Sequence, residues 1–179
     1  MRTAMVAGGI GSAELADLVA RGATLEFRVG VSTLTRLAAL SPVAAVEAAS
    51  LNAGLTFRPG SEGHPQLRLT VAGSVPLVCQ RCLDLLVLPV QVDVLLTMVR
   101  NDQEAAGLAD PFDTVLLADG GLVPELVVED EVLAALPLAP RHAESDACGR
   151  EERANSGEMH RPLAGLADLL GRGDRQGDK

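Results

Sequence analysis

Apolar and polar residues alternate on both sides of one short cysteine motif in the middle of the chain. Before Cys79-Gln80-Arg81-Cys82, residues 66–78 place Leu67, Leu69 and Val71 at every second position, and residues 87–99 continue the alternation after it. A period of two is typical of a β-strand that has one buried and one exposed face. The pattern therefore predicts two strands joined at a C-x-x-C turn, and these strands are neighbours in one sheet.

The same reading of the pattern divides the rest of the chain into shorter elements. Spacing of three and four between apolar residues, with a helix-stopping Gly or Pro afterwards, predicts helices at residues 12–21, 32–40 and 122–136. Alternation predicts strands at 24–31, 43–57 and 114–118. Residues 101–113 are polar and contain Gly107 and Pro111, which predicts a loop.

These elements predict an α+β fold: an antiparallel sheet of about five strands with a few packed helices. We expect the helix at 122–136 to cross the sheet through Leu126, Leu133 and Leu136. The predicted domain spans residues 1–142. Residues 143–179 carry alternating charges, Gly and Ser, and are expected to be irregular or partly disordered apart from a short amphipathic helix near 162–170.

Composition limits the kinds of partner and compartment. The chain has 179 residues, an apolar content of 47% and a formal net charge of −9, without Trp or Tyr. A negative chain without these aromatic side chains lacks both the bulk electrostatics and the stacking platforms of most nucleic-acid-binding proteins. The sequence has no apolar segment long enough to predict a membrane span or a signal peptide. Three cysteines in a chain without an export signal point to a reducing cytoplasm.

The cysteines are candidate zinc ligands. A C-x-x-C at a β-turn is a common half-site, and a tetrahedral set could be completed by Cys148 and His142 together with Cys79 and Cys82. The alternative is that the thiols are reduced and partly buried without a metal. A redox role is less favoured, because oxidoreductase C-x-x-C motifs sit at a helix N-terminus and here a strand follows the motif.

Two charged groups are candidate docking sites for a partner. Arg81 in the turn and Arg100 after the following strand are candidates for a small basic face, although two solvated arginines are the simpler interpretation. The run Glu129-Asp130-Glu131 is either a solvated helix face or a docking surface for a basic partner. No arrangement of nucleophile, base and acid can be recognised, so we expect no enzyme activity.

Four features in this order resemble the YceD family of bacterial and plastid proteins. They are the Cys79-Gln80-Arg81-Cys82 turn, the acidic helix that ends at Pro137 and Pro140, the His142 and Cys148 stretch, and the Pro-Leu-Ala-x-Leu segment at 162–166. The resemblance covers roughly residues 24–171. Some members carry a second close cysteine pair after the proline exit, whereas this chain has only Cys148 there.

The resemblance implies a cytoplasmic, non-catalytic role in 23S rRNA accumulation and large-subunit ribosome biogenesis. The expected partner is a pre-ribosomal particle or a ribosomal protein, with rRNA contacted directly or through that partner. The resemblance also favours the hypothesis that Glu129, Asp130 and Glu131 form a docking surface. The alternative is a zinc- or thiol-dependent regulatory protein, or a protein-interaction module with no RNA role.

Overall fold

The structure is a computed structural model that describes residues 9–60, 63–108, 113–117, 121–143 and 148. The chain divides into two units, Met1–His142 and Ala143–Lys179, and all the helices and strands named below lie in the first unit. The predicted helix near 162–170 lies outside the described residues. Among the described helices, none is both long and apolar enough to cross a membrane.

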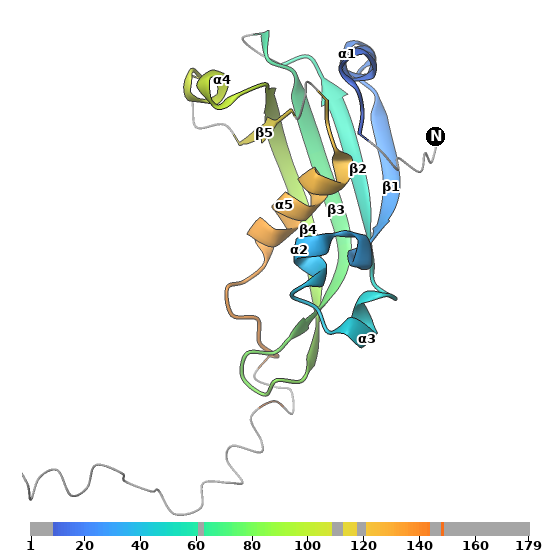
Figure 1. Cartoon of the computed structure of the whole chain (residues 1–179), viewed down its shortest axis with the longest axis vertical. Helices are drawn as coiled ribbons and strands as arrows, with labels where there is room; N and C mark the ends of the chain where they lie inside the picture. The colour runs from blue at the N-terminus through green and yellow to red at the C-terminus, as the bar shows by residue number, and fades with distance from the viewer. Residues whose placement is uncertain (1–8, 61–62, 109–112, 118–120, 144–147, 149–179) are drawn as a thin grey trace, which may run out of the picture. The chain divides into compact units, whose positions relative to one another are not determined.

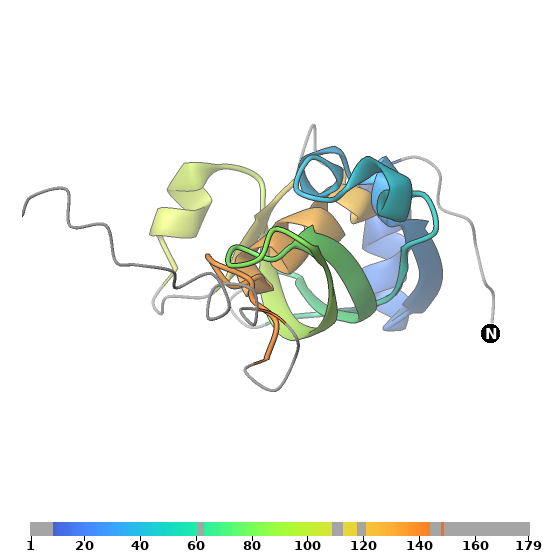
Figure 2. The same ribbon diagram turned by 90° about the horizontal axis from the view of Figure 1, so that it is seen from below.

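The first unit is built on one five-stranded sheet whose strands lie side by side in chain order (Figure 1). The sheet curls into a half-barrel (Figure 2). Its strands are β1 Thr24–Gly30, β2 Ser50–Arg58, β3 Gln66–Val78, β4 Leu85–Val99 and β5 Thr114–Leu116. The helical elements are α1 Ser12–Arg21, η1 Val31–Thr33, α2 Thr35–Ala38, α3 Val43–Val46, α4 Asp102–Ala106 and α5 Pro124–Ala135. The α+β class and the five strands confirm the prediction.

Alternation along the strands builds the core. In the register of β2 with β3, Leu55 lies opposite Leu69 and Phe57 lies opposite Leu67, and all four side chains are buried. Burial of alternate residues on one face is the property that the period-two pattern predicted. Because a one-residue slip would expose this whole row, the apolar pattern also determines the register.

The last strand differs from the prediction of a purely antiparallel sheet. β5 pairs with β4 in the parallel direction, through partners such as Met98 and Val115. Parallel neighbours need a crossover connection, and the chain makes it through residues 101–113. Part of this predicted loop is helical: α4 begins after Asn101, whose side chain accepts a hydrogen bond from the backbone N–H of Glu104.

The chain between β1 and β2 also corrects the prediction. The expected helix at 32–40 is a 3-10 turn, η1, followed by the short α2, and the strand expected from residue 43 begins only at Ser50. Residues 43–46 form α3, which follows Pro42 and buries Val46. Alanine-rich sequence after a proline favours a helical turn, and this preference prevails over the weak alternation of odd positions.

Two prolines mark where the β3–β4 hairpin extends beyond the rest of the sheet as a two-stranded arm. Pairing of β2 with β3 ends at Gly73, whereas β3 and β4 remain paired as far as Val78 and Leu85. In β4 the odd-numbered residues direct their backbone groups away from β3, as the bond from Thr97 N–H to the Asp113 carbonyl shows. Pro89 occupies such a position, and Pro76 faces the side that β2 has left. Neither proline removes a bond of the β3–β4 ladder.

Helix α5 crosses the sheet over β3 and β4 (Figure 1). Its buried apolar face consists of Val127, Val128 and Val132. Leu133 and Leu136 pack against the core as partly buried side chains, as expected, but Leu126 is 50% exposed. At about 100° per residue, Leu126 lies roughly 200° around the helix from Val128, so it cannot share the buried face. The prediction that Leu126 belongs to the core-facing side of the helix is therefore wrong.

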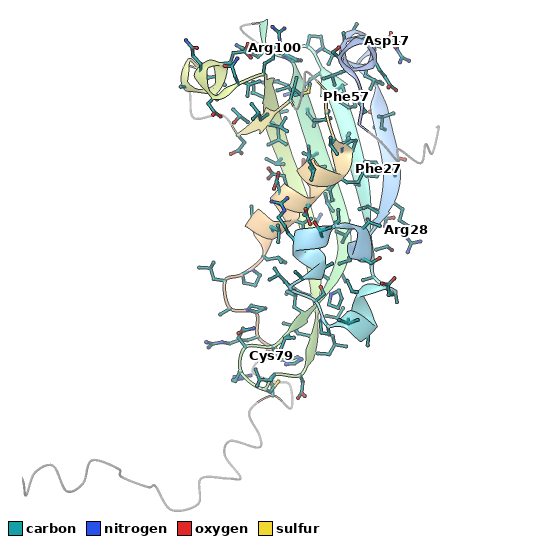
Figure 3. All side chains as sticks on the ribbon, viewed as in Figure 1. Asp17, Phe27, Arg28, Phe57, Cys79 and Arg100 are labelled. Carbon is teal, nitrogen blue, oxygen red and sulfur yellow. The ribbon has the colours of Figure 1, made fainter. Side chains whose placement is uncertain are left out.

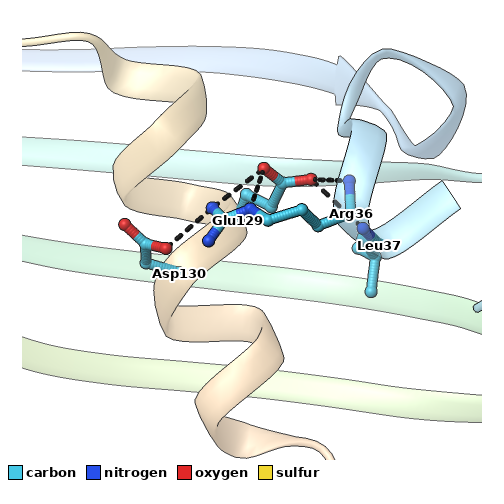
Figure 4. A network of polar contacts seen from close by, with 4 residues as sticks. All are labelled: Arg36, Leu37, Glu129 and Asp130. Atoms are coloured by element: carbon cyan, nitrogen blue, oxygen red, sulfur yellow. Dashed lines mark hydrogen bonds and ion pairs between the residues drawn. The ribbon is translucent and has the colours of Figure 1, made fainter. Parts of the chain in front are cut away.

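A buried carboxylate joins α5 to α2 (Figure 4). Glu129 is only 2% exposed, and it accepts hydrogen bonds from the backbone N–H groups of Arg36 at 2.7 Å and Leu37 at 3.1 Å. The Arg36 guanidinium completes the shell, with Nε at 3.0 Å and a second nitrogen at 2.9 Å from Glu129, and it also pairs with Asp130 at 2.7 Å. A buried carboxylate needs partners of this kind to offset its lost hydration.

The pKa of Glu129 reflects this competition. Burial alone raises it, but the hydrogen bonds from Leu37 and Arg36 together with the Arg36 charge bring the pKa below its ordinary value of 4.5. A carboxylate with a lowered pKa stabilises the fold at pH values above its unfolded pKa. This contribution disappears as the pH falls through the folded pKa.

We therefore predict that Glu129→Ala lowers the free energy of unfolding at pH 7 by about 3 kcal/mol, because two buried N–H donors lose their acceptor. Urea unfolding followed by circular dichroism measures this. The difference between the variant and the unsubstituted protein should begin to shrink below pH 4.5, where Glu129 of the unfolded chain takes up its proton, and should be lost as the pH falls through the lower folded pKa.

The matched control is Asp93→Ala, which breaks the exposed ion pair with Arg68 at 2.7 Å. Exposed pairs contribute little to stability, so this variant should unfold close to the unsubstituted protein. Equal losses in the two variants would contradict the assigned role of Glu129.

Candidate metal site

The cysteine motif lies in a tight turn at the tip of the β3–β4 arm. The backbone N–H of Cys79 donates to the Asp84 carbonyl at 2.9 Å, and the N–H of Leu83 donates to the Cys79 carbonyl at 3.0 Å. Leu83 has a φ of +65°, the left-handed conformation that lets the chain reverse. The motif therefore lies at the turn between β3 and β4, as the sequence predicted.

The segment that follows α5 returns to this turn. The N–H of Gln80 donates to the Pro140 carbonyl at 2.8 Å, and Nε2 of His142 lies 3.0 Å from the Leu85 carbonyl oxygen. The two contacts attach residues 140–142 to the cysteine turn and to the first residue of β4. Sequence far from the cysteines thereby contributes a histidine to the site.

Cys79, Cys82 and His142 form a compact set of metal-ligand side chains. Their sulfur and nitrogen atoms lie within 4.8 Å of one another, and Cys82 Sγ is 3.4 Å from His142 Nδ1. In a tetrahedral zinc site with Zn–S of about 2.3 Å and Zn–N of about 2.0 Å, a sulfur and a nitrogen ligand lie about 3.5 Å apart. The spacing therefore fits zinc. Cys79 is fully buried, and the other two side chains are half-buried.

The contacts of His142 determine its tautomer. The Leu85 carbonyl can only accept a hydrogen bond, so Nε2 carries the proton and donates it. In the neutral ring, Nδ1 then keeps its lone pair and directs it toward Cys82. Metal-ligating histidines are commonly oriented in this way, by donating the other ring N–H to a carbonyl.

Cys148, the fourth candidate ligand, lies in the second unit. Four ligands of the types S, S, S and N satisfy the usual composition of a structural zinc site. The first unit by itself brings together three of the four residues that the sequence analysis selected as candidate ligands.

The two candidate arginines are not brought together. Arg81 lies within the cysteine turn, whereas Arg100 follows the opposite end of β4, where its N–H donates to Glu104 at 2.8 Å (Figure 3). The acidic run of α5 is divided as well. Glu129 is buried and bonded to Arg36, so it is not part of an exposed docking surface. Asp130 is exposed but paired with Arg36, and Glu131 is half-buried.

Sequence reasoning missed several groups that support these sites. Arg36 is the charge partner of Glu129, and the carbonyls of Leu85 and Pro140 attach the histidine-bearing segment. No pattern in the sequence indicates a backbone carbonyl as a partner, since every residue has one. Arg36 lies in a short helix far from Glu129 in the sequence, and no sequence pattern indicates that these two residues pair.

We predict that Leu83→Gly stabilises the turn. A left-handed conformation costs a side chain with a Cβ roughly 1–2 kcal/mol, and Leu83 is 74% exposed, so little burial is lost with it. Thermal unfolding should shift upward. The control Val87→Gly replaces another exposed apolar residue, at a regular strand position, and should lower the melting temperature. A downward shift for Leu83→Gly would contradict the strain assigned to this residue.

Comparison with known proteins identifies the family. Neither the curated proteins nor the solved structures contain a match to this chain. The model of one family, described as "Large ribosomal RNA subunit accumulation protein YceD", matches residues 67–170. The matched part contains the cysteine turn, α5 and both of the residues that follow it in the ligand group. It covers more than half of the chain and confirms the resemblance, and the chain therefore belongs to the YceD family.

Proposed function

We propose that this protein is a non-catalytic cytoplasmic factor that supports 23S rRNA accumulation by binding a pre-ribosomal particle. The observation that carries the proposal is the family match, whose description names accumulation of the large ribosomal RNA subunit. An RNA accumulates when it is protected or assembled into a particle as it is made. A factor that catalyses no reaction can provide this protection by binding to the particle.

The charge of the chain favours a protein of the particle as the direct contact. A net charge of −9 repels phosphates, and without Trp or Tyr the chain lacks the usual stacking surface for bases. Basic ribosomal proteins would be attracted by the same charge. The protein would then support rRNA accumulation indirectly, by binding a protein of the particle and not the rRNA itself.

We propose that the site at the hairpin tip binds zinc through Cys79, Cys82, His142 and Cys148. Four protein ligands would close the coordination sphere, which is typical of structural and not of catalytic zinc. The metal would connect the hairpin tip to the segment after α5, where hydrogen bonds already hold residues 140–142. The same ligand group supports the second candidate function, a zinc- or thiol-dependent regulatory or protein-interaction module without an RNA role.

The proposed zinc site predicts the metal content of the purified protein. Protein purified without chelator should contain about one zinc per chain by elemental analysis, as expected for one tetrahedral site. The Cys79→Ser/Cys82→Ser variant should lose the zinc and unfold at a lower temperature, and His142→Ala should bind it more weakly. The control His64→Ala alters a histidine outside the ligand group and should keep the metal. Absence of zinc, combined with no thiolate-to-cobalt absorption after Co²⁺ addition, would refute the site.

The ribosomal role is tested by crosslinking the tagged protein in cells and identifying the RNA and proteins recovered. We expect 23S rRNA precursors or large-subunit proteins to be enriched, and depletion of the protein to lower the 23S to 16S ratio. Recovery of ribosomal proteins without RNA would support indirect contact. Recovery of neither class would contradict the proposal, and normal rRNA with a zinc-dependent partner would favour the second candidate.

A further inference from the structure

A groove with an apolar floor and an acidic rim lies between β5 and α5. It has a volume of about 410 Å³, within the usual range for ligand pockets. We call it the β5–α5 groove and define it by Leu96, Val115, Leu116, Leu126, Asp130 and Glu131. It belongs to the first unit and shares no residue with the metal-ligand group.

Both walls of the groove carry leucines exposed to solvent. Leu116 on β5 is 55% exposed and Leu126 on α5 is 50% exposed, while Leu96 at the floor is buried. Leu126 is exposed because α5 turns its valine face to the sheet. Large apolar side chains that border a groove from two elements mark an interaction surface more strongly than scattered ones.

The rim is acidic, and a nearby cation balances its charge only in part. None of the described residues that line the groove is basic. Arg36 neutralises part of the Asp130 charge, at 2.7 Å. For Glu131, burial and the neighbouring charges of Asp113 and Asp130 all raise the pKa, so a cation placed here would relieve repulsion that the fold leaves uncompensated. The same field repels phosphate, which favours a cationic peptide over RNA as the occupant.

The groove also borders the free edge of the sheet. β5 is the last strand, and the described residues place no further strand beside it. Asp113 carbonyl and Leu117 N–H bond to β4, so the alternate residues Thr114 and Leu116 direct their backbone groups outward. An extended chain can pair with such an edge and place alternate side chains on the surface beside it. The edge is short, so apolar and charge contacts must supply most of the affinity.

We propose that the β5–α5 groove binds an extended, basic segment of a protein partner, which adds as a strand to β5 and places apolar side chains on the groove floor. The identity of the partner rests on the proposed function: the basic arms that bind rRNA are the cationic chains that a pre-ribosomal particle offers. The groove would hold such an arm before it reaches the RNA. The factor would thereby support rRNA accumulation without touching rRNA.

The binding test uses the full chain and a fluorophore-labelled synthetic peptide in which lysine alternates with valine, followed by fluorescence anisotropy. The variant Leu126→Ser/Glu131→Lys should weaken binding by about ten-fold or more, the loss expected when a central apolar contact and a charge contact are removed. Leu116→Ser, on the opposite wall, should weaken it as well. The matched control Leu40→Ser/Glu47→Lys changes the same residue types at exposed positions outside the groove and should stay within about two-fold.

Equal binding by the groove and control variants would overturn the inference, and so would equal binding of a peptide in which glutamate replaces lysine. Displacement of the peptide by a short single-stranded RNA that itself binds the groove would overturn it too. Thermal unfolding of each variant verifies that the fold is kept, which is expected because the substituted leucines are exposed.

Sedimentation of cell extracts separates this inference from the proposed function. Co-sedimentation with large-subunit precursors that is lost in Leu126→Ser/Glu131→Lys and kept in the control would support the inference. Co-sedimentation kept by both variants would overturn it and leave the proposed function intact. Failure of the unsubstituted protein to co-sediment would instead overturn the proposed function, while the peptide experiment would still decide what the groove binds.

Discussion

Pairing of β3 with β4 is the interaction on which the other parts of the first unit depend. The register runs from Gln66 opposite Thr97 to Val78 opposite Leu85, without an interruption. One half of this hairpin lies in the sheet and contributes core residues, and the other half extends as an arm that ends in the cysteine turn. Because the ladder is continuous, it fixes the position of the cysteine turn at one end of the hairpin. The other edge of β4 pairs with β5. The cysteine turn and the β5–α5 groove, at the two ends of β4, thus depend on one set of backbone hydrogen bonds.

The Glu129 carboxylate is the second constraint, and it acts on the helices. It replaces water with two backbone N–H groups of α2 and the Arg36 guanidinium, all of them distant in sequence. A valine face alone would let α5 slide or rotate over the sheet, since apolar contacts are not directional. The charge-assisted bonds select one rotation. That rotation places the exposed Leu126 and the half-buried Glu131 beside β5, so the groove is a consequence of the buried ion pair.

The tip and the groove suit different tasks. At the tip, thiols and an oriented imidazole form a ligand group in which polar contacts are satisfied locally, and a bound metal would rigidify the hairpin end. At the groove, two exposed leucines and an acidic rim that Arg36 balances only in part suit the basic partner proposed above. A ligand group at the hairpin tip and a separate groove beside β5 are consistent with the binding role proposed above.

The amino-acid sequence by itself determined the strands, the position of the cysteine turn and the candidate ligands, because alternation and motif spacing are local properties that survive without tertiary context. It failed where local preferences compete, as at residues 43–46, and where a neighbour supplies the deciding contact, as for the parallel pairing of β5. Only the tertiary structure decided that Glu129 is buried while Glu131 borders a groove. Adjacent acidic residues look alike in sequence, and their different roles follow from Arg36, Leu37 and Asp113, which only folding brings to them.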